Sequence, residues 1–470
     1  MTPQDVVERA LALSRSDGCI VLAEESSTAN LRWANNTLTT NGVTRTRDLT
    51  VIAVADGAEG RSAGVVTRSG VTLDDVEAMV RAAEAKARSL PPAEDAAPLL
   101  AAGRPGQGWD APPDETSVEV FSSLAPALGE LFQAAVASGR TLYGYAEHDV
   151  TTTYLATSTG VRLRHDQPTG RIELTGRSTD GSRSAWAGRS TRGFDDVDVL
   201  ELDAAVTQRL DWARRRTDLP AGRYETILPP SAVGDLMTYL YWSAVALDAH
   251  EGRTVFSRRG GGTRIGDRLT DLEVTLRSDP GLQGLECSPF LATDASSRYA
   301  SVFDNGMAVG PTDWIHDGRL AALVQTRHSA RVTGLEPTPF VDNLQLAGPQ
   351  GGSDGTGGTG GTGGTGGMIA ATRRGLLLTC LWYIREVDPQ TLLLTGLTRD
   401  GVFLVEDGEV TGAVNNFRFN ESPVDLLGRL AEVGPAEPTL PREFGDYFTR
   451  VAMPPVRVAD FNMSSVSQAS

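Results

Sequence analysis

The side chains that most readily bind metals or act as nucleophiles are few and widely spaced in this sequence. The histidines and cysteines are His148, His165, His250, His316, His328, Cys19, Cys287 and Cys380. No two histidines lie within a helical turn or two of each other, which excludes a metal site built from two histidines on one helix. The three separated cysteines form neither a disulfide framework nor a zinc knuckle. Any metal site would need ligands from distant segments.

His250 and Glu251 form a His-Glu dipeptide. In zinc peptidases of the zincin type, a second histidine follows such a pair one helical turn later, and residues 252–255 provide none. A cationic histidine near a helix C-terminus also interacts favourably with the helix dipole. The pattern favours a surface pair, with a metallopeptidase that uses His250, Glu251 and a distant group as an alternative.

Cys287, in Glu286-Cys287-Ser288-Pro289, offers a different chemistry. A cysteine can act as a nucleophile with a histidine from far along the chain. A lone cysteine beside a proline is more often a small packed apolar residue. The sequence favours the packed cysteine and leaves a cysteine hydrolase as an alternative.

Composition limits the class of protein. The 470 residues allow two or three domains, and a hydrophobic fraction of 40% is enough to fill their cores. No apolar run approaches the roughly 18–20 residues of a membrane span, and the N-terminal residues lack the pattern of a signal peptide. A net charge of −17 repels nucleic-acid phosphates and anionic lipids. We therefore expect a cytoplasmic protein with neither nucleic acid nor membrane as a partner.

The first half of the chain mixes helical and strand patterns. Predicted helices are 4–15, 73–88, an amphipathic segment around 124–135, and 199–213. Predicted strands are 19–24, 30–37, 47–55, 61–67 and several within 142–174. The breaking sequence Leu219-Pro220-Ala221-Gly222 marks a domain boundary. We predict an α+β protein whose residues 1–218 form an N-terminal α/β sandwich-like domain.

The second half, residues 219–470, is predicted to be a β-rich domain. A helix is expected from Ser231 to about Ala249, and short apolar runs then alternate with Asn-Gly and Asp-Gly turns. The clearest hairpin joins 402–405 to 410–414 around Asp407-Gly408. Residues 351–367 are mostly glycine and threonine, lack the lysine of a phosphate-binding loop, and are expected to form a flexible loop.

Several short segments of the chain follow one another in a particular order. They are Trp33-Ala34-Asn35-Asn36, Asp56-Gly57, Ser158-Thr159-Gly160-Val161, Phe303-Asp304-Asn305-Gly306, Trp314-Ile315-His316-Asp317-Gly318-Arg319-Leu320 and Asp342-Asn343-Leu344. In order and spacing these segments resemble the TldD/PmbA family, also called the TldD/TldE family, over nearly the whole chain. The resemblance lies in their succession and in no single segment.

The resemblance implies one of two kinds of subunit. TldD-type subunits carry His-Glu-x-x-x-His on a helix and a distant cysteine near the C-terminus. Two histidines can bind one zinc ion while the glutamate activates the bound water. TldE/PmbA-type subunits lack these ligands and pair with a TldD-type subunit to form a cytoplasmic protease.

In this sequence the corresponding helix follows the turn Leu228-Pro229-Pro230. The two histidine positions are then Thr238 and Ser243, and the glutamate position is Tyr239. Hydroxyl groups are poor zinc ligands compared with imidazole or thiolate, and no cysteine follows Leu426. The resemblance therefore implies a chain with no catalytic residue and no metal ligand, whose zinc is supplied by a TldD-type partner.

The implied function is that of a TldE/PmbA-like subunit of a metalloprotease acting on unfolded or flexible peptides. A metal-free peptide-binding homodimer is a further alternative. Tyr239, Tyr241 and Trp242 lie at helical spacing, which is typical of a core but also allows a peptide groove. The pattern favours the core.

Overall fold

The computed structural model describes residues 2–101, 108–349 and 364–467 and confirms the predicted α+β class. Most of the predicted flexible loop at 351–367 lies outside the described residues. Its last three residues begin helix α8 (Thr365–Ala371), so the loop ends earlier than predicted. Met368 of this helix is fully buried and packs against Ile227, Leu377, Phe403 and Val405.

The N-terminal domain is built on one antiparallel sheet with the strand order β3-β2-β1-β4-β5-β6. Its strands are β1 (Gly18–Ala34), β2 (Thr37–Gly57), β3 (Gly60–Ser69), β4 (Arg140–Thr157), β5 (Arg162–Ser178) and β6 (Ser184–Thr191). The two strands predicted at 19–24 and 30–37 are one strand, β1. The polar stretch between them stays extended because Ser27 and Ala29 face the interior and pairing with β2 and β4 is continuous.

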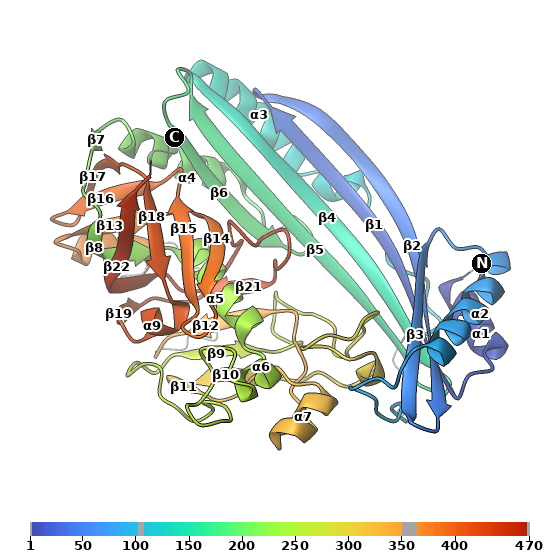
Figure 1. The fold of residues 1–470 in the computed structure, drawn as a ribbon. Helices are drawn as coiled ribbons and strands as arrows, with labels where there is room; N and C mark the ends of the chain where they lie inside the picture. Colours follow the sequence, from blue (N-terminus) through green and yellow to red (C-terminus); the bar gives the residue numbers. More distant parts are fainter. Residues whose placement is uncertain (1, 102–107, 350–363, 468–470) are drawn as a thin grey trace.

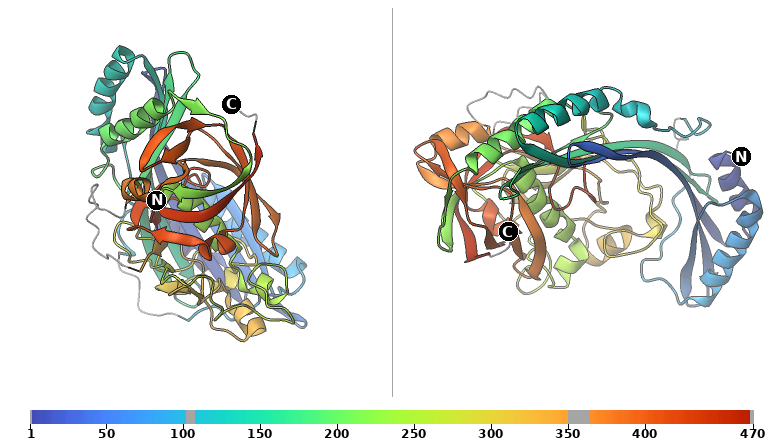
Figure 2. Two further views of the ribbon diagram at one scale, coloured as in Figure 1. Left: turned by 90° about the vertical axis from the view of Figure 1, so that its left-hand side faces the viewer. Right: turned by 90° about the horizontal axis from the view of Figure 1, so that it is seen from above.

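Four helices cover one face of this sheet, where the odd-numbered residues Val21, Leu31 and Trp33 of β1 are buried. They are α1 (Pro3–Leu13), α2 (Leu73–Ser89), α3 (Leu124–Ala137) and α4 (Val199–Trp212), with a short 3-10 turn η1 (Val118–Phe121) before α3. Helices α1 and α2 pack around Val21 and Val51, and α3 and α4 pack around Leu31 and Leu174. The long strands arch from one helix pair to the other (Figures 1 and 2).

The opposite face of the sheet meets the C-terminal domain. Ile20 packs with Val302 and Phe303, and Leu22 packs with Phe290. Further along β1 this face is polar, with Thr28 donating to Asp149 at 2.6 Å. The first residues of strand β1 therefore pack against both the N-terminal helices and the C-terminal domain.

The C-terminal domain contains two sheets that enclose the largest core. The larger sheet has the order β14-β15-β18-β22-β8-β13-β16-β17-β7, with β19 paired to β22. Its strands are β7 (Arg216–Thr217), β8 (Gly222–Leu228), β13 (Arg374–Leu378), β14 (Leu381–Asp388), β15 (Leu393–Thr398), β16 (Val402–Glu406), β17 (Glu409–Val414), β18 (Phe417–Glu421), β19 (Leu430–Val433) and β22 (Val456–Val466). The predicted Asp407-Gly408 hairpin is confirmed, and both turn residues have positive φ.

The smaller sheet has the order β11-β10-β9-β12-β21-β20. Its strands are β9 (Thr275–Ser278), β10 (Thr312–His316), β11 (Arg319–Leu320), β12 (Leu344–Ala347), β20 (Glu437–Thr439) and β21 (Val451–Met453). The remaining elements are α5 (Pro230–Ser243), α6 (Ala246–His250), α7 (Arg327–Thr333), α9 (Pro423–Leu427) and the 3-10 turn η2 (Val302–Asp304). Among the described residues, no helix combines the length and apolar content that crossing a membrane requires.

The helix predicted from Ser231 to Ala249 is interrupted in the structure. Helix α5 ends at Ser243, and Val245 forms an isolated β-bridge with Val324 before α6 begins. Backbone bonds join Ala246 N–H to Val324 O at 3.0 Å and Val324 N–H to Ala244 O at 2.8 Å. The tertiary contact with Val324 thus overrides the helical pattern at this point.

Candidate functional site

Helix α5 holds the three positions at which the family resemblance places metal-site residues. Pro230 starts the helix, where a proline costs no backbone hydrogen bond. Leu236, Met237 and Leu240 are buried in the core of the C-terminal domain. The helix is therefore fixed on most of its surface by packing.

Thr238 faces this core and is fully buried. Its Oγ1 atom has no hydrogen-bond partner among the described residues. A buried hydroxyl without a partner destabilises a fold by roughly 1–3 kcal/mol. The Thr238 hydroxyl is therefore a net cost to the stability of the fold.

Tyr239 and Ser243 lie one helical turn apart on another side of α5. The Tyr239 ring packs against Phe444 with a centroid distance of 5.7 Å, and Ser243 Oγ donates to the Tyr239 carbonyl at 2.9 Å. In a regular helix, residues 238 and 243 diverge by roughly 140°. The structure thus brings Tyr239 and Ser243 together but directs Thr238 elsewhere.

The donors at Thr238, Tyr239 and Ser243 do not fit a zinc ion. Thr238 offers a hydroxyl inside the core, and Ser243 uses its hydroxyl to cap a carbonyl of its own helix. Burial raises the pKa of Tyr239, which keeps its phenol protonated at neutral pH. Protonated hydroxyls lack the anionic or imidazole donor atoms that zinc prefers.

No group of three or more His, Cys, Asp or Glu side chains arranged to hold a metal occurs in the part of the chain that the structure describes. Glu251 beside His250 pairs with Arg298, and it also pairs with Arg253 at 3.1 Å. Asp248, one turn earlier, accepts from Arg298 at 2.9 Å. The carboxylates nearest His250 are therefore engaged by arginines.

The three thiols are all buried. Burial raises the pKa of Cys287 and of Cys380 to about 12, and that of Cys19 to about 11. A thiol with such a pKa stays protonated at neutral pH, whereas a cysteine nucleophile acts as the thiolate. The surroundings of Cys287 therefore disfavour the cysteine hydrolase alternative.

Asp235, one turn before Thr238, is a buried acid that the sequence analysis missed. Its carboxyl oxygens accept three backbone N–H groups: Arg442 at 3.1 Å, Glu443 at 2.8 Å and Phe444 at 3.2 Å. Residues 440–448 are called the strap below. Burial raises the pKa of Asp235 to about 8, although these three donors favour its ionised form.

The strap also contacts the N-terminal domain through Arg442. Its guanidinium lies over the Trp186 ring at 5.0 Å and over the Trp382 ring at 4.5 Å, and it pairs with Glu173 at 3.2 Å. Trp186 and Glu173 belong to β6 and β5, whereas Trp382 belongs to β14. Asp235 thus ties helix α5 to a segment that joins both domains.

The aromatic residues of α5 mainly form core, as predicted. Tyr241 is fully buried, its hydroxyl donates to the Val341 carbonyl at 2.9 Å, and its ring stacks on Phe340 at 4.8 Å. Trp242 is half-buried and packs on Phe444 at 5.1 Å. The strap therefore covers this side of the helix.

Two family descriptions match the sequence. The PmbA/TldA metallopeptidase C-terminal domain matches residues 221–465, and PmbA/TldA metallopeptidase domain 1 matches residues 19–87. The chain belongs to the PmbA/TldD metallopeptidase family. No curated protein matches the sequence significantly.

Solved structures share the whole fold at low sequence identity. TldE from Thermococcus kodakarensis is 15% identical with a TM-score of 0.74, covering 98% of this chain and 99% of its own. A protein named as a proposed DNA gyrase modulator from Thermotoga maritima is 16% identical with a TM-score of 0.75 and the same coverage. A similarly named protein from Bacteroides thetaiotaomicron is 16% identical with a TM-score of 0.72, covering 99% of this chain and 98% of its own. These structural similarities establish the fold of the chain.

The unpartnered hydroxyl of Thr238 gives a first testable prediction. Thr238→Val keeps the shape and removes the buried hydroxyl, so we expect the free energy of unfolding to rise by about 1 kcal/mol. Thr226→Val is the matched control, because Thr226 is equally buried but donates to the Tyr224 carbonyl at 3.0 Å. The control should lose stability. Urea unfolding of both variants measures this, and a loss in Thr238→Val would show that its hydroxyl has a partner.

Asp235 gives a prediction about pH. Its pKa is raised from 3.8 to about 8 in the folded chain, so between these values the folded state binds the extra proton. Stability from this group is complete below pH 4 and falls as pH rises towards 8. Asp235→Asn, which does not titrate, should show a shallower decline of unfolding free energy between pH 5 and 8. Equal slopes for the two proteins in denaturant titrations would contradict the raised pKa.

Proposed function

We propose that this chain is the non-catalytic, TldE/PmbA-type subunit of a cytoplasmic metalloprotease. A TldD-type partner supplies the zinc and the catalytic groups. The observation that carries the proposal is helix α5, where the motif positions hold Thr238, Tyr239 and Ser243, which offer hydroxyl groups in place of imidazole and carboxylate. Family membership supports the connection to metallopeptidases.

The substrates in this proposal are unfolded or flexible peptides. The family resemblance implies a cavity shared by the two subunits, which a folded protein does not enter. This chain closes the cavity, helps to hold the peptide and stabilises its partner. The fold shared with the Thermococcus kodakarensis TldE supports this role at the level of architecture.

The surface next to α5 is the part of this chain that we assign to the TldD-type subunit. Tyr447 of the strap is 77% exposed, and Tyr383 on edge strand β14 is 59% exposed. Tyr383 N–H donates to Glu443 in the strap at 3.0 Å, so the two tyrosines belong to neighbouring segments. Exposed tyrosines are enriched at the centres of stable interfaces.

Co-expression with a TldD-type chain that carries an intact His-Glu-x-x-x-His tests the proposal. We expect a stable heterodimer that contains zinc and cleaves a flexible peptide such as casein, whereas this chain alone does not. Tyr447→Ala should weaken the heterodimer at least tenfold, because truncating a central aromatic costs about 2 kcal/mol. Val136→Ala, a change on the N-terminal domain at a residue that is 66% exposed, is the control and should bind normally.

A second test of the proposal uses the chain in isolation, without a TldD-type partner. Installing Thr238→His, Tyr239→Glu and Ser243→His should not create peptidase activity, because position 238 faces the core and a third ligand is lacking. Light scattering that shows a monomer at micromolar concentration, with no binding to the co-expressed TldD-type chain, would refute the proposed partnership. A stable homodimer that binds peptides without zinc would instead support the metal-free alternative.

A further inference from the structure

The outer edge of the N-terminal sheet changes along strand β2. Residues 48–57 of β2 pair with β1 on one side and with β3 on the other, whereas residues 37–46 pair with β1 alone among the described strands. All of residues 37–46 except Gly42 are exposed. This part of β2 forms the outer margin of the arched sheet beyond the end of β3 (Figure 1). We call residues 37–46 the β2 edge.

The backbone of the β2 edge has groups that point away from the sheet. The Arg47 carbonyl accepts from the Gly70 N–H at 2.8 Å, so residue 47 directs its backbone groups to the side of β3. Residues of an antiparallel strand direct their backbone groups alternately to one side and the other. Asn41, Val43 and Arg45 therefore direct N–H and C=O away from β1. Within the described part of the chain these groups have no protein partner.

Strand β3, which continues the same margin of the sheet, is protected against pairing. Lys86, the only lysine of the chain, donates to the Val65 carbonyl at 3.0 Å, and the Ala93 N–H donates to the Arg61 carbonyl at 2.8 Å. Lysine, proline and covering segments are common means of preventing contact between sheet edges. Residues 37–46 contain neither lysine nor proline. The β2 edge is therefore able to accept another strand.

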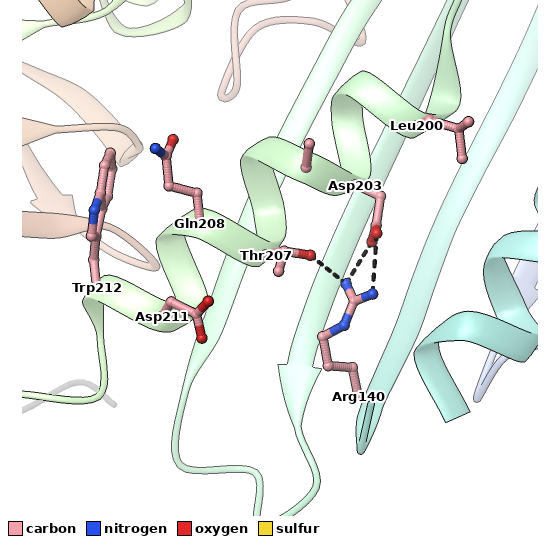
Figure 3. Close-up of a pocket in the computed structure, with 8 residues that line it drawn as sticks. Arg140, Leu200, Asp203, Thr207, Gln208, Asp211 and Trp212 are labelled. Atoms are coloured by element: carbon pink, nitrogen blue, oxygen red, sulfur yellow. Dashed lines mark hydrogen bonds and ion pairs between the residues drawn. The ribbon is translucent and has the colours of Figure 1, made fainter. Parts of the chain in front are cut away.

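The β2 edge is held extended although it is exposed. It begins at the turn Asn35-Asn36, where both residues have the positive φ of a hairpin turn. The Asn36 side chain donates to the Arg140 carbonyl at 2.9 Å. The Arg140 guanidinium donates in turn to Asp203 at 2.6 Å and to Thr207 at 2.7 Å, which fixes this end of the sheet to helix α4 (Figure 3). A strand fixed in this way loses little entropy when it pairs.

The sequence of the β2 edge is complementary to itself. Antiparallel pairing of two identical strands creates a twofold axis. With the axis at Val43, this residue lies opposite its counterpart in the second copy, and Asn41 lies opposite Arg45. The outward backbone groups of these three residues then form about six hydrogen bonds between the copies. Like charges do not face each other in this register, and Arg45 already pairs with Glu115 of its own chain at 2.6 Å.

Charge favours the β2 edge as a contact between two copies. Two chains with a net charge of −17 repel each other over most of their surfaces. Residues 37–46 contain no acid, and their one cation, Arg45, is paired. Leu38 and Val43, which are 44% and 41% exposed, add apolar area. An extended peptide offers the same backbone groups, but it loses chain entropy on binding, whereas a second copy brings a strand that is already extended.

We propose that two copies of this chain associate through the β2 edge, in an antiparallel pair of β2 strands centred on Val43 that joins the two N-terminal sheets into one. The contact goes beyond the proposed protease function, because it needs neither zinc nor a TldD-type subunit. It also uses other residues than Tyr383 and Tyr447, which we assign to that subunit. Its test therefore fails or succeeds independently of the proposed function.

Analytical ultracentrifugation of the purified full chain over a series of concentrations tests the contact. We expect a reversible dimer with a Kd on the order of 100 μM, because one pair of strands lies at the small end of specific interfaces. Hydrogen exchange measured residue by residue identifies the surface. Exchange should slow with rising concentration at the N–H groups of Asn41, Val43 and Arg45. It should not change at Gly42 and Thr44, whose backbone groups are directed towards β1.

Two variants at the centre of the contact should each weaken the dimer at least tenfold. Val43→Pro removes an outward N–H and leaves the hydrogen bonds with β1 intact, as proline does on an edge strand. Val43→Lys places two like charges at the twofold axis, and it decides the question if Val43→Pro does not fold. Val136→Lys is the matched control, because it is the same substitution at a residue of α3 that is 66% exposed. It should dimerise normally, as should Tyr447→Ala.

Three results would overturn the proposal. The first is a protein that stays monomeric well above the expected Kd. The second is a dimer that both Val43 variants retain, or that Tyr447→Ala loses instead. The third is slowed exchange at Asn41, Val43 and Arg45 on addition of unfolded casein to a monomeric protein, which would identify a peptide-binding edge. Circular dichroism of each variant shows whether a lost dimer reflects a lost fold.

Discussion

The buried carboxyl of Asp235 is the interaction on which the arrangement of the two domains depends. It accepts three successive backbone N–H groups of the strap, which would otherwise be buried without partners. The strap in turn places Arg442 between Trp186 and Trp382, one ring from each domain. Helix α5, the strap and the N-terminal sheet therefore form one connected unit.

This connection holds α5 in place through contacts of the chain itself. In a zinc enzyme the ion cross-links its ligands and adds binding free energy to folding. Here the corresponding helix is held by core packing, by Asp235 and by the aromatic contacts of Tyr241 with Phe340. Thr238 has become part of the core, at the cost of an unpartnered hydroxyl. The helix thus has a structural role that does not depend on catalysis.

Much of the fold was predictable because it follows local patterns. The Asp407-Gly408 hairpin and helix α4 match their periodicity and turn residues. The interruption at Val245 and the continuity of β1 were not predictable, since both depend on pairing with distant strands. The assignment of motif positions on α5 stays a prediction from family resemblance, and the contact between Asp235 and the strap was not predicted. An isolated aspartate in an apolar helix was the only signal for it, and its three partners lie some 200 residues away in sequence.

The zinc content of the isolated chain tests the central claim most directly. The protein is purified without chelator and without a TldD-type partner, and its metal is measured by inductively coupled plasma mass spectrometry. The account predicts far less than one zinc per chain, because Thr238, Tyr239 and Ser243 offer only hydroxyl groups, which are poor zinc ligands. One zinc per chain that a chelator removes, together with peptide cleavage that disappears with it, would contradict the account and establish a metallopeptidase with unorthodox ligands.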